Sequence, residues 1–144
     1  MTPAEKEVRK ASEQFYAALN LMANGNPGAL ADIWSKGDDT TTMHPIGGRE
    51  VGWDRVQEAF RQVARIASDG RIRVEEQIVN VVGDLAYELG VERGSLKLVG
   101  KQAAIEHRVT NIYRREGGKW KIVHHHTDIS PAMVEITSEL LARS

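Results

Sequence analysis

The fold is decided by one stretch of the chain, Thr110–Thr127, which reads TNIYRREGGKWKIVHHHT. Its centre, Glu116-Gly117-Gly118, is typical of a tight turn. Apolar and polar residues interleave on both sides of that turn, as they do in half-buried strands. The stretch therefore predicts a β-hairpin whose strands run from roughly Val99 to Arg115 and from Lys119 to Ile129.

Before this hairpin the chain changes from a helical to an extended pattern. Apolar residues recur at helical spacing after Thr2-Pro3, a capping residue followed by a proline that suits the first turn. Further on, β-branched residues and period-two alternation indicate strands. The expected helices are 2–22, 27–34, 51–67 and one starting at Ser130-Pro131, and the other expected strands are 40–43, 72–82 and 85–93, with turns at Gly83-Asp84 and Gly94-Ser95.

This order of elements predicts an α+β fold in which helices cover one face of an antiparallel sheet. The chain has 144 residues, the size of one ordinary domain, and we expect a single domain spanning 1–144. With 41% apolar and 27% charged residues it can build a core. The absence of cysteine excludes disulfides, thiolate metal sites and a cysteine nucleophile.

The hairpin resembles the end of SnoaL-like proteins in the nuclear transport factor 2 (NTF2-like) superfamily. Residues Arg108, Thr110, Trp120, His124 and His126 occupy the places of that family's Arg, Thr, Trp and His-x-His pattern. The resemblance implies a cone-shaped, curved antiparallel sheet of the NTF2-like or cystatin-like type, with helices on its concave face and a ligand pocket inside. Two further stretches look similar, 43–53 (MHPIGGREVGW) and 83–87 (GDLAY).

Strand alternation sorts the hairpin into two faces. The resemblance suggests that Arg108, Thr110, His124 and His126 point into the cone, and that His125 points outward. A bulge would reverse part of this assignment. An inward Arg108 needs a partner. It either pairs structurally with Glu106, Asp128 or Glu88, or it binds a ligand carboxylate or enolate.

The histidines His124 and His126 have three interpretations. They are hydrogen-bonded core residues, or a general acid/base pair titrating near neutral pH, or metal ligands completed by His44 or a carboxylate. By contrast, His107 is expected to face away, towards an interface. The catalytic candidates are thus His124, His126 and Arg108, no metal is assigned, and the ligand-binding candidates are Tyr16, Trp34, His44, Trp53, Phe60, Tyr87, Thr110, Ile112 and Trp120.

These features predict a protein that binds a small, mainly apolar molecule with one polar or anionic group and transfers a proton at it. That chemistry is the isomerase, cyclase or dehydratase type. The alternative is a non-catalytic binding or assembly module, and in either case we expect a homodimer. Nucleotide-binding loop patterns are absent, so no cofactor is expected. A net charge of −1 and the lack of a long apolar run predict a cytoplasmic protein that binds neither nucleic acid nor membrane.

Overall fold

A computed structural model describes residues 1–142 of the chain, so the predicted domain is described up to that residue. It has an α+β fold with one mixed six-stranded sheet in the order β2-β1-β6-β5-β4-β3. The elements in chain order are α1 (Pro3–Met22), α2 (Leu30–Ile33), β1 (Thr41–His44), β2 (Gly47–Val51), α3 (Trp53–Ile66), β3 (Ala67–Val82), β4 (Leu85–Leu98), β5 (Lys101–Glu116), β6 (Lys119–Thr127) and α4 (Pro131–Ala142).

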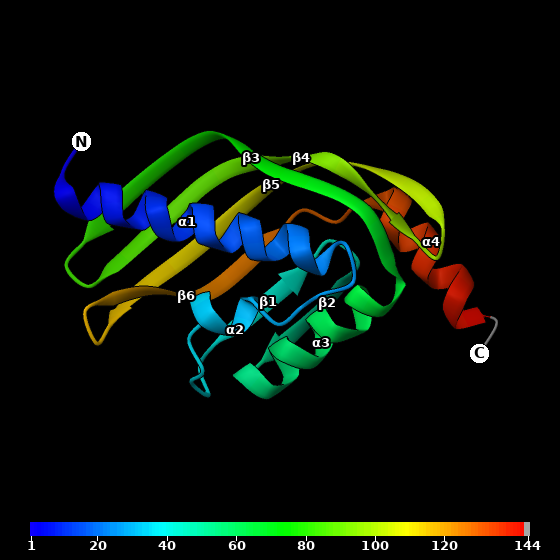
Figure 1. Ribbon diagram of the computed structural model, residues 1–144, viewed down its shortest axis with the longest axis horizontal. Coiled ribbons are helices and arrows are strands. Elements are labelled where there is room, and N and C mark those ends of the chain that lie inside the picture. Colours follow the sequence, from blue (N-terminus) through cyan, green and yellow to red (C-terminus); the bar gives the residue numbers. More distant parts are fainter. Residues whose placement is uncertain (143–144) are drawn as a thin grey trace.

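The sheet curves around helix α1, which crosses its concave face, while α2 and α3 lie beside β1 and β2 and α4 lies at one end (Figure 1). Thr2 caps α1 as predicted, since its hydroxyl accepts a hydrogen bond from the Glu5 amide at 3.1 Å. Aromatic side chains fill the space between helices and sheet. The Trp34 ring lies 6.1 Å from Phe15 and 5.6 Å from Phe60, which fixes the helices against one another.

Three expectations for the strands were wrong. Residues Gly47–Val51, where no strand was expected, form β2, which pairs with β1. Strand β4 continues through Gly94-Ser95, and its turn to β5 lies at Val99-Gly100 instead. The sheet is mixed because β1 runs parallel to β6. Tight turns join antiparallel strands only, so no turn signal in the sequence could predict this pairing.

A β-bulge in β6 decides which side chains face the helices. Ile122 pairs with Tyr113, but the next pairing joins His124 to Ile112, which leaves Val123 as an extra residue. An extra residue reverses the alternation beyond it. Trp120 and Ile122 are therefore buried on the inner face, whereas the histidine buried farther along the strand is His125.

Gly94 is expected to be a critical residue of the sheet. Its φ is +146°, and a Cβ built there would lie 1.8 Å from the carbonyl oxygen of Arg71 on β3. Replacement by alanine should therefore force the strands apart and cost about 3 kcal/mol of unfolding free energy. Gly83→Ala is the control, because φ is +62° there but nothing lies within 4 Å. It should cost about 1 kcal/mol, and urea titrations of both variants test the difference.

Candidate functional site

The inner face of the sheet and the helices enclose a cavity of about 50 Å³. Most of its wall is apolar, with side chains from α1, α3, α4 and the sheet. Four polar residues interrupt that wall, one from each of four strands: His44 on β1, Glu92 on β4, His107 on β5 and His125 on β6. The apolar part of the lining is Leu19, Met22, Pro45, Ile46, Phe60, Val63, Ile72, Leu96, Ile105 and Met133.

Glu92 and His107 form a hydrogen-bonded pair at the cavity wall. His107 Nε2 lies 2.7 Å from Glu92 Oε1, and each side chain is only 4% exposed. The other carboxylate oxygen, Oε2, accepts a hydrogen bond from the Tyr16 hydroxyl at 2.8 Å. An ionised carboxylate can only accept hydrogen bonds, so His107 carries its hydrogen on Nε2. In the neutral ring the lone pair of Nδ1 is then free.

Asn111 connects this pair to His125. Its amide nitrogen donates to the Tyr16 hydroxyl at 3.1 Å and to Glu88 Oε1 at 2.9 Å. The amide oxygen of Asn111 therefore faces His125, whose Nδ1 lies 2.6 Å away. Because an amide oxygen only accepts, His125 must carry its hydrogen on Nδ1. Asn111 thus sets the tautomer of a cavity-lining histidine.

Glu88 anchors the far end of this network. It is fully buried and accepts four hydrogen bonds, from the hydroxyls of Ser12 and Tyr113 and the amides of Gln77 and Asn111. Gln77 reaches it because β3 has a bulge between Glu75 and Ile78. Both carboxylate oxygens are therefore satisfied, which allows a charge to remain buried. Glu88 has a supporting role and does not line the cavity.

Burial controls the protonation of the cavity-lining groups. It lowers the pKa of His44 to about 4, with a further contribution from His125, and it also lowers the pKa of His125. Burial alone would raise the pKa of Glu92, but the hydrogen bond from His107, electrostatic interactions with His125 and His107 and the hydrogen bond from Tyr16 together outweigh it and hold that pKa below the ordinary value. At neutral pH the cavity therefore contains a carboxylate beside uncharged His44 and His125.

Two fully buried ring nitrogens at this cavity have no partner within the described residues. They are His107 Nδ1 and His44 Nε2, and both are buried. An unpartnered buried polar atom costs stability, because it has lost its hydrogen bonds to water. Their presence beside an apolar cavity indicates where a ligand's polar group would bind.

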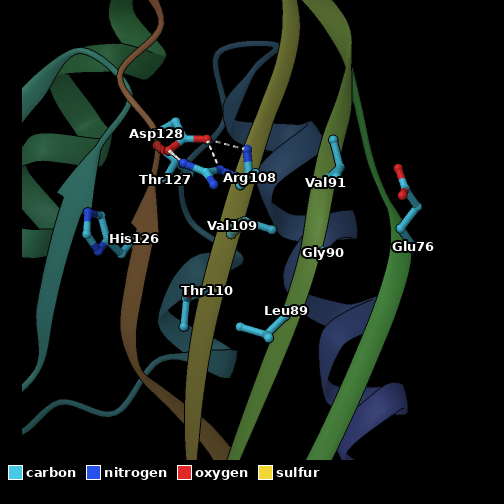
Figure 2. A pocket seen from close by; sticks show the side chains of 10 residues that line it. All are labelled: Glu76, Leu89, Gly90, Val91, Arg108, Val109, Thr110, His126, Thr127 and Asp128. Carbon is cyan, nitrogen blue, oxygen red and sulfur yellow. Dashed lines mark hydrogen bonds and ion pairs between the residues drawn. The ribbon is translucent and has the colours of Figure 1, made fainter.

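The residues predicted to be catalytic lie on the opposite, outer face of the sheet. Arg108, Thr110, His124 and His126 do share one face, but the prediction that this face points inward is wrong, and His125 and His107 are inside. Figure 2 shows Arg108, Thr110 and His126 along a groove of about 430 Å³, with the helices behind the sheet. The family resemblance correctly predicted that these residues share one face of the sheet, but it wrongly predicted that this is the inner face.

On that outer face Arg108 is held by Asp128. Arg108 Nε lies 2.8 Å from Oδ2, and Nη2 lies 3.0 Å from Oδ1, a two-pronged pair (Figure 2). The hydrogen bonds from the Arg108 side chain lower the pKa of the Asp128 carboxyl group to about 2. The Arg108 side chain is nevertheless 83% exposed. Of the sequence alternatives, the structural Arg–carboxylate pair is therefore the one present, with Asp128 as partner.

The predicted ligand-binding residues divide into three groups. His44 and Phe60 line the cavity, and Tyr16 reaches it through Glu92. Trp34, Trp53 and Trp120 pack in or against the core, and Tyr87, Thr110 and Ile112 lie on the outer face. Sequence reasoning did not select Glu92, His107, Asn111 or His125 as site residues. The signal for His107 and Asn111 was present in β5, where they share the inner face with Ile105, Val109 and Tyr113.

The metal alternative has no geometric support. Within residues 1–142 no group of three or more His, Asp or Glu side chains is placed to hold an ion. Nor is any helix in that range long and apolar enough to cross a bilayer.

Comparisons with known proteins agree with this architecture. The family profile described as SnoaL-like domain matches residues 8–133. An NTF2-like protein from Streptomyces avermitilis, provisionally named a dehydratase, is similar with a TM-score of 0.78 at 22% identity, covering 89% of this chain and 98% of its own. No curated protein matches the chain.

Two other solved structures show how varied proteins of this shape are. One, provisionally named a calcium/calmodulin-dependent protein kinase type II association domain, comes from Thiobacillus denitrificans, with a TM-score of 0.67, 25% identity and coverage of 84% of this chain and 93% of that one. The other, provisionally named a ketosteroid isomerase, comes from Shewanella frigidimarina, with a TM-score of 0.67, 18% identity and coverage of 83% and 92%. Likeness at this level establishes the fold and leaves the chemistry to the site.

Proposed function

This chain belongs to the SnoaL-like domain family, and on that premise we propose that it binds a small, mainly apolar molecule in the inner cavity and transfers a proton at it. The observation that carries the proposal is the unpartnered Nδ1 of His107, buried at the cavity wall and backed by Glu92. A carboxylate that orients an imidazole and stabilises its protonated form is a common arrangement for a general base.

The proposed reaction follows from these contacts. His107 Nδ1 takes a proton from the carbon next to a ligand carbonyl, and the imidazolium that forms is stabilised by Glu92. His44, whose tautomer no neighbour fixes, donates from Nε2 to the carbonyl oxygen as negative charge develops there. In a ligand with a β,γ-double bond, return of the proton to the γ-carbon gives isomerisation. In a ligand with a β-hydroxyl, the His107 imidazolium returns the proton to that hydroxyl, which leaves as water and gives dehydration.

The cavity changes one expectation about the ligand. Among residues 1–142 no arginine or lysine lines it, whereas the Glu92 carboxylate does. An anionic group would therefore lose its hydration without gaining a cation. The ligand's polar group should be neutral.

The test is exchange of the α-protons of cyclopentanone and butanone for deuterium in heavy water, followed by proton NMR. Catalysed exchange by the purified protein supports the proposal. Exchange at the buffer rate, with both ketones shown to bind, would overturn it.

A second candidate function, self-assembly, is favoured by the outer face of the sheet. Several large apolar side chains of β3 and β4 are exposed there, among them Ile78 at 54%, Leu85 at 51% and Leu89 at 38%. Contiguous exposed apolar surface of this kind commonly marks an interface. We propose that a second copy of the chain packs on this face and forms a homodimer, with or without catalysis in the cavity.

Leu89→Arg should separate such a dimer. A charge placed in the centre of an apolar interface should weaken association by roughly thirtyfold or more. Leu21→Arg is the matched control, since Leu21 is 46% exposed on α1, away from the sheet face. Sedimentation velocity over a concentration series measures both. A wild-type monomer at all concentrations would rule the homodimer out.

A further inference from the structure

The polar groups of the inner cavity have fixed hydrogen-bonding roles, and these roles select a class of ligand. Glu92 accepts from His107 Nε2, so the cavity-facing nitrogen left on that ring is an acceptor. Asn111 accepts from His125 Nδ1, so the nitrogen left on that ring, Nε2, is an acceptor too. Within residues 1–142 no side chain or amide donates to either of these nitrogens.

The tautomers are fixed because every group in the chain of hydrogen bonds has only one consistent assignment. Glu88 Oε1 accepts one amide hydrogen of Asn111, and the Tyr16 hydroxyl accepts the other. Tyr16 then donates its own hydrogen to Glu92. The amide of Asn111 cannot be turned around without placing its oxygen against the Glu88 carboxylate.

We infer that the cavity takes a neutral, hydroxyl-bearing small molecule, whose O–H donates to His125 Nε2 while His107 Nδ1 faces the carbon that loses a proton. This inference rests on the proposed function, since it names the substrate class of the same site. A carbonyl-only ligand finds an adaptable donor at His44 but offers no hydrogen to the acceptor Nε2 of His125. A carboxylate meets the Glu92 charge.

The test compares propan-2-ol, acetone and acetate, three probes of nearly equal size suited to a cavity of about 50 Å³. Binding is followed by the shifts of the protein's imidazole signals in NMR titrations. Propan-2-ol should bind about tenfold tighter than acetone, the equivalent of one buried hydrogen bond, and acetate should not bind.

Glu92→Gln gives the sharpest variant. The Tyr16 hydroxyl must still donate, because Asn111 already donates to it. The new amide oxygen therefore faces Tyr16, and the amide N–H faces His107 Nε2. His107 must then move its hydrogen to Nδ1 and become a donor towards the cavity. Acetone should gain affinity about tenfold in this variant, and the preference for propan-2-ol should disappear. Asn80→Asp on the exposed side of β3 is the control and should keep the wild-type preference.

The wild-type tautomers provide a readout that needs neither ligand nor variant. Nitrogen-15 NMR should find hydrogen on His107 Nε2 and His125 Nδ1 and none on the two opposite nitrogens. A doubly protonated His107, a His125 with its hydrogen on Nε2, or a preference for acetone in the wild type overturns the inference alone. If none of the three probes shifts the imidazole signals, the proposed binding function falls, and this assignment of its ligand falls with it.

Discussion

Replacement of His107 by glutamine should slow catalysed α-proton exchange of the ketone probes by roughly hundredfold or more. Glutamine can still donate an amide hydrogen to Glu92, which lies 2.7 Å from the ring in the wild type, so the buried carboxylate keeps a partner. What glutamine lacks is a basic nitrogen at the cavity wall. The loss should therefore appear in kcat, while the unfolding free energy changes little.

His126→Gln is the matched control for this experiment. His126 is exposed on the outer face, at the groove shown in Figure 2. It was the candidate base under the sequence interpretation, so the two variants separate the two assignments. We expect the wild-type exchange rate for His126→Gln. Loss of exchange in His126→Gln together with normal exchange in His107→Gln would place the chemistry on the outer face and refute the proposed base.

The fold could be predicted from sequence because its signals are local. The Thr2 cap, the Gly117-Gly118 turn and the alternation after Ile72 each act over a few residues. The errors arose where distant segments meet. The sequence around Gly94 predicts a turn, yet Gly94 lies within a strand. Glycine is required there because the backbone of Arg71 on the neighbouring strand leaves no room for a Cβ atom. The pairing between β1 and β6 likewise cannot be predicted from local sequence patterns, because the two strands are far apart in the chain.

The site was harder to predict because a single extra residue governs it. Without the bulge at Val123, the inward Trp120 and Ile122 imply an inward His124. With it, His125 is buried instead. In β5 the apolar residues Ile105 and Val109 indicate the inner face correctly, whereas the family pattern indicates the opposite face. A buried carboxylate such as Glu92 carries no sequence signal, since its partners come from other elements.

Acid should destabilise the protein well above the pH at which its carboxylates titrate. His44 is buried against Phe60, with ring centroids 5.1 Å apart, and burial lowers its pKa to about 4. An unfolded chain binds a proton at this ring near pH 6.5, whereas the folded protein does so only near pH 4. Stability is unaffected above that window and falls as the pH drops through it. For His44 alone the loss is roughly 3 kcal/mol.

His44→Phe isolates this contribution. Phenylalanine keeps an aromatic ring against Phe60 and removes both the titration and the unpartnered Nε2. Urea unfolding at about pH 7 and about pH 4.5 should therefore show a loss in the wild type that is roughly 2–3 kcal/mol larger than in the variant. A smaller loss should remain in the variant, because burial also lowers the pKa of His125. An equal loss in both proteins would mean that the fold does not keep His44 uncharged. The cavity would then contain a positive charge that attracts anionic ligands, contrary to the neutral ligand proposed above.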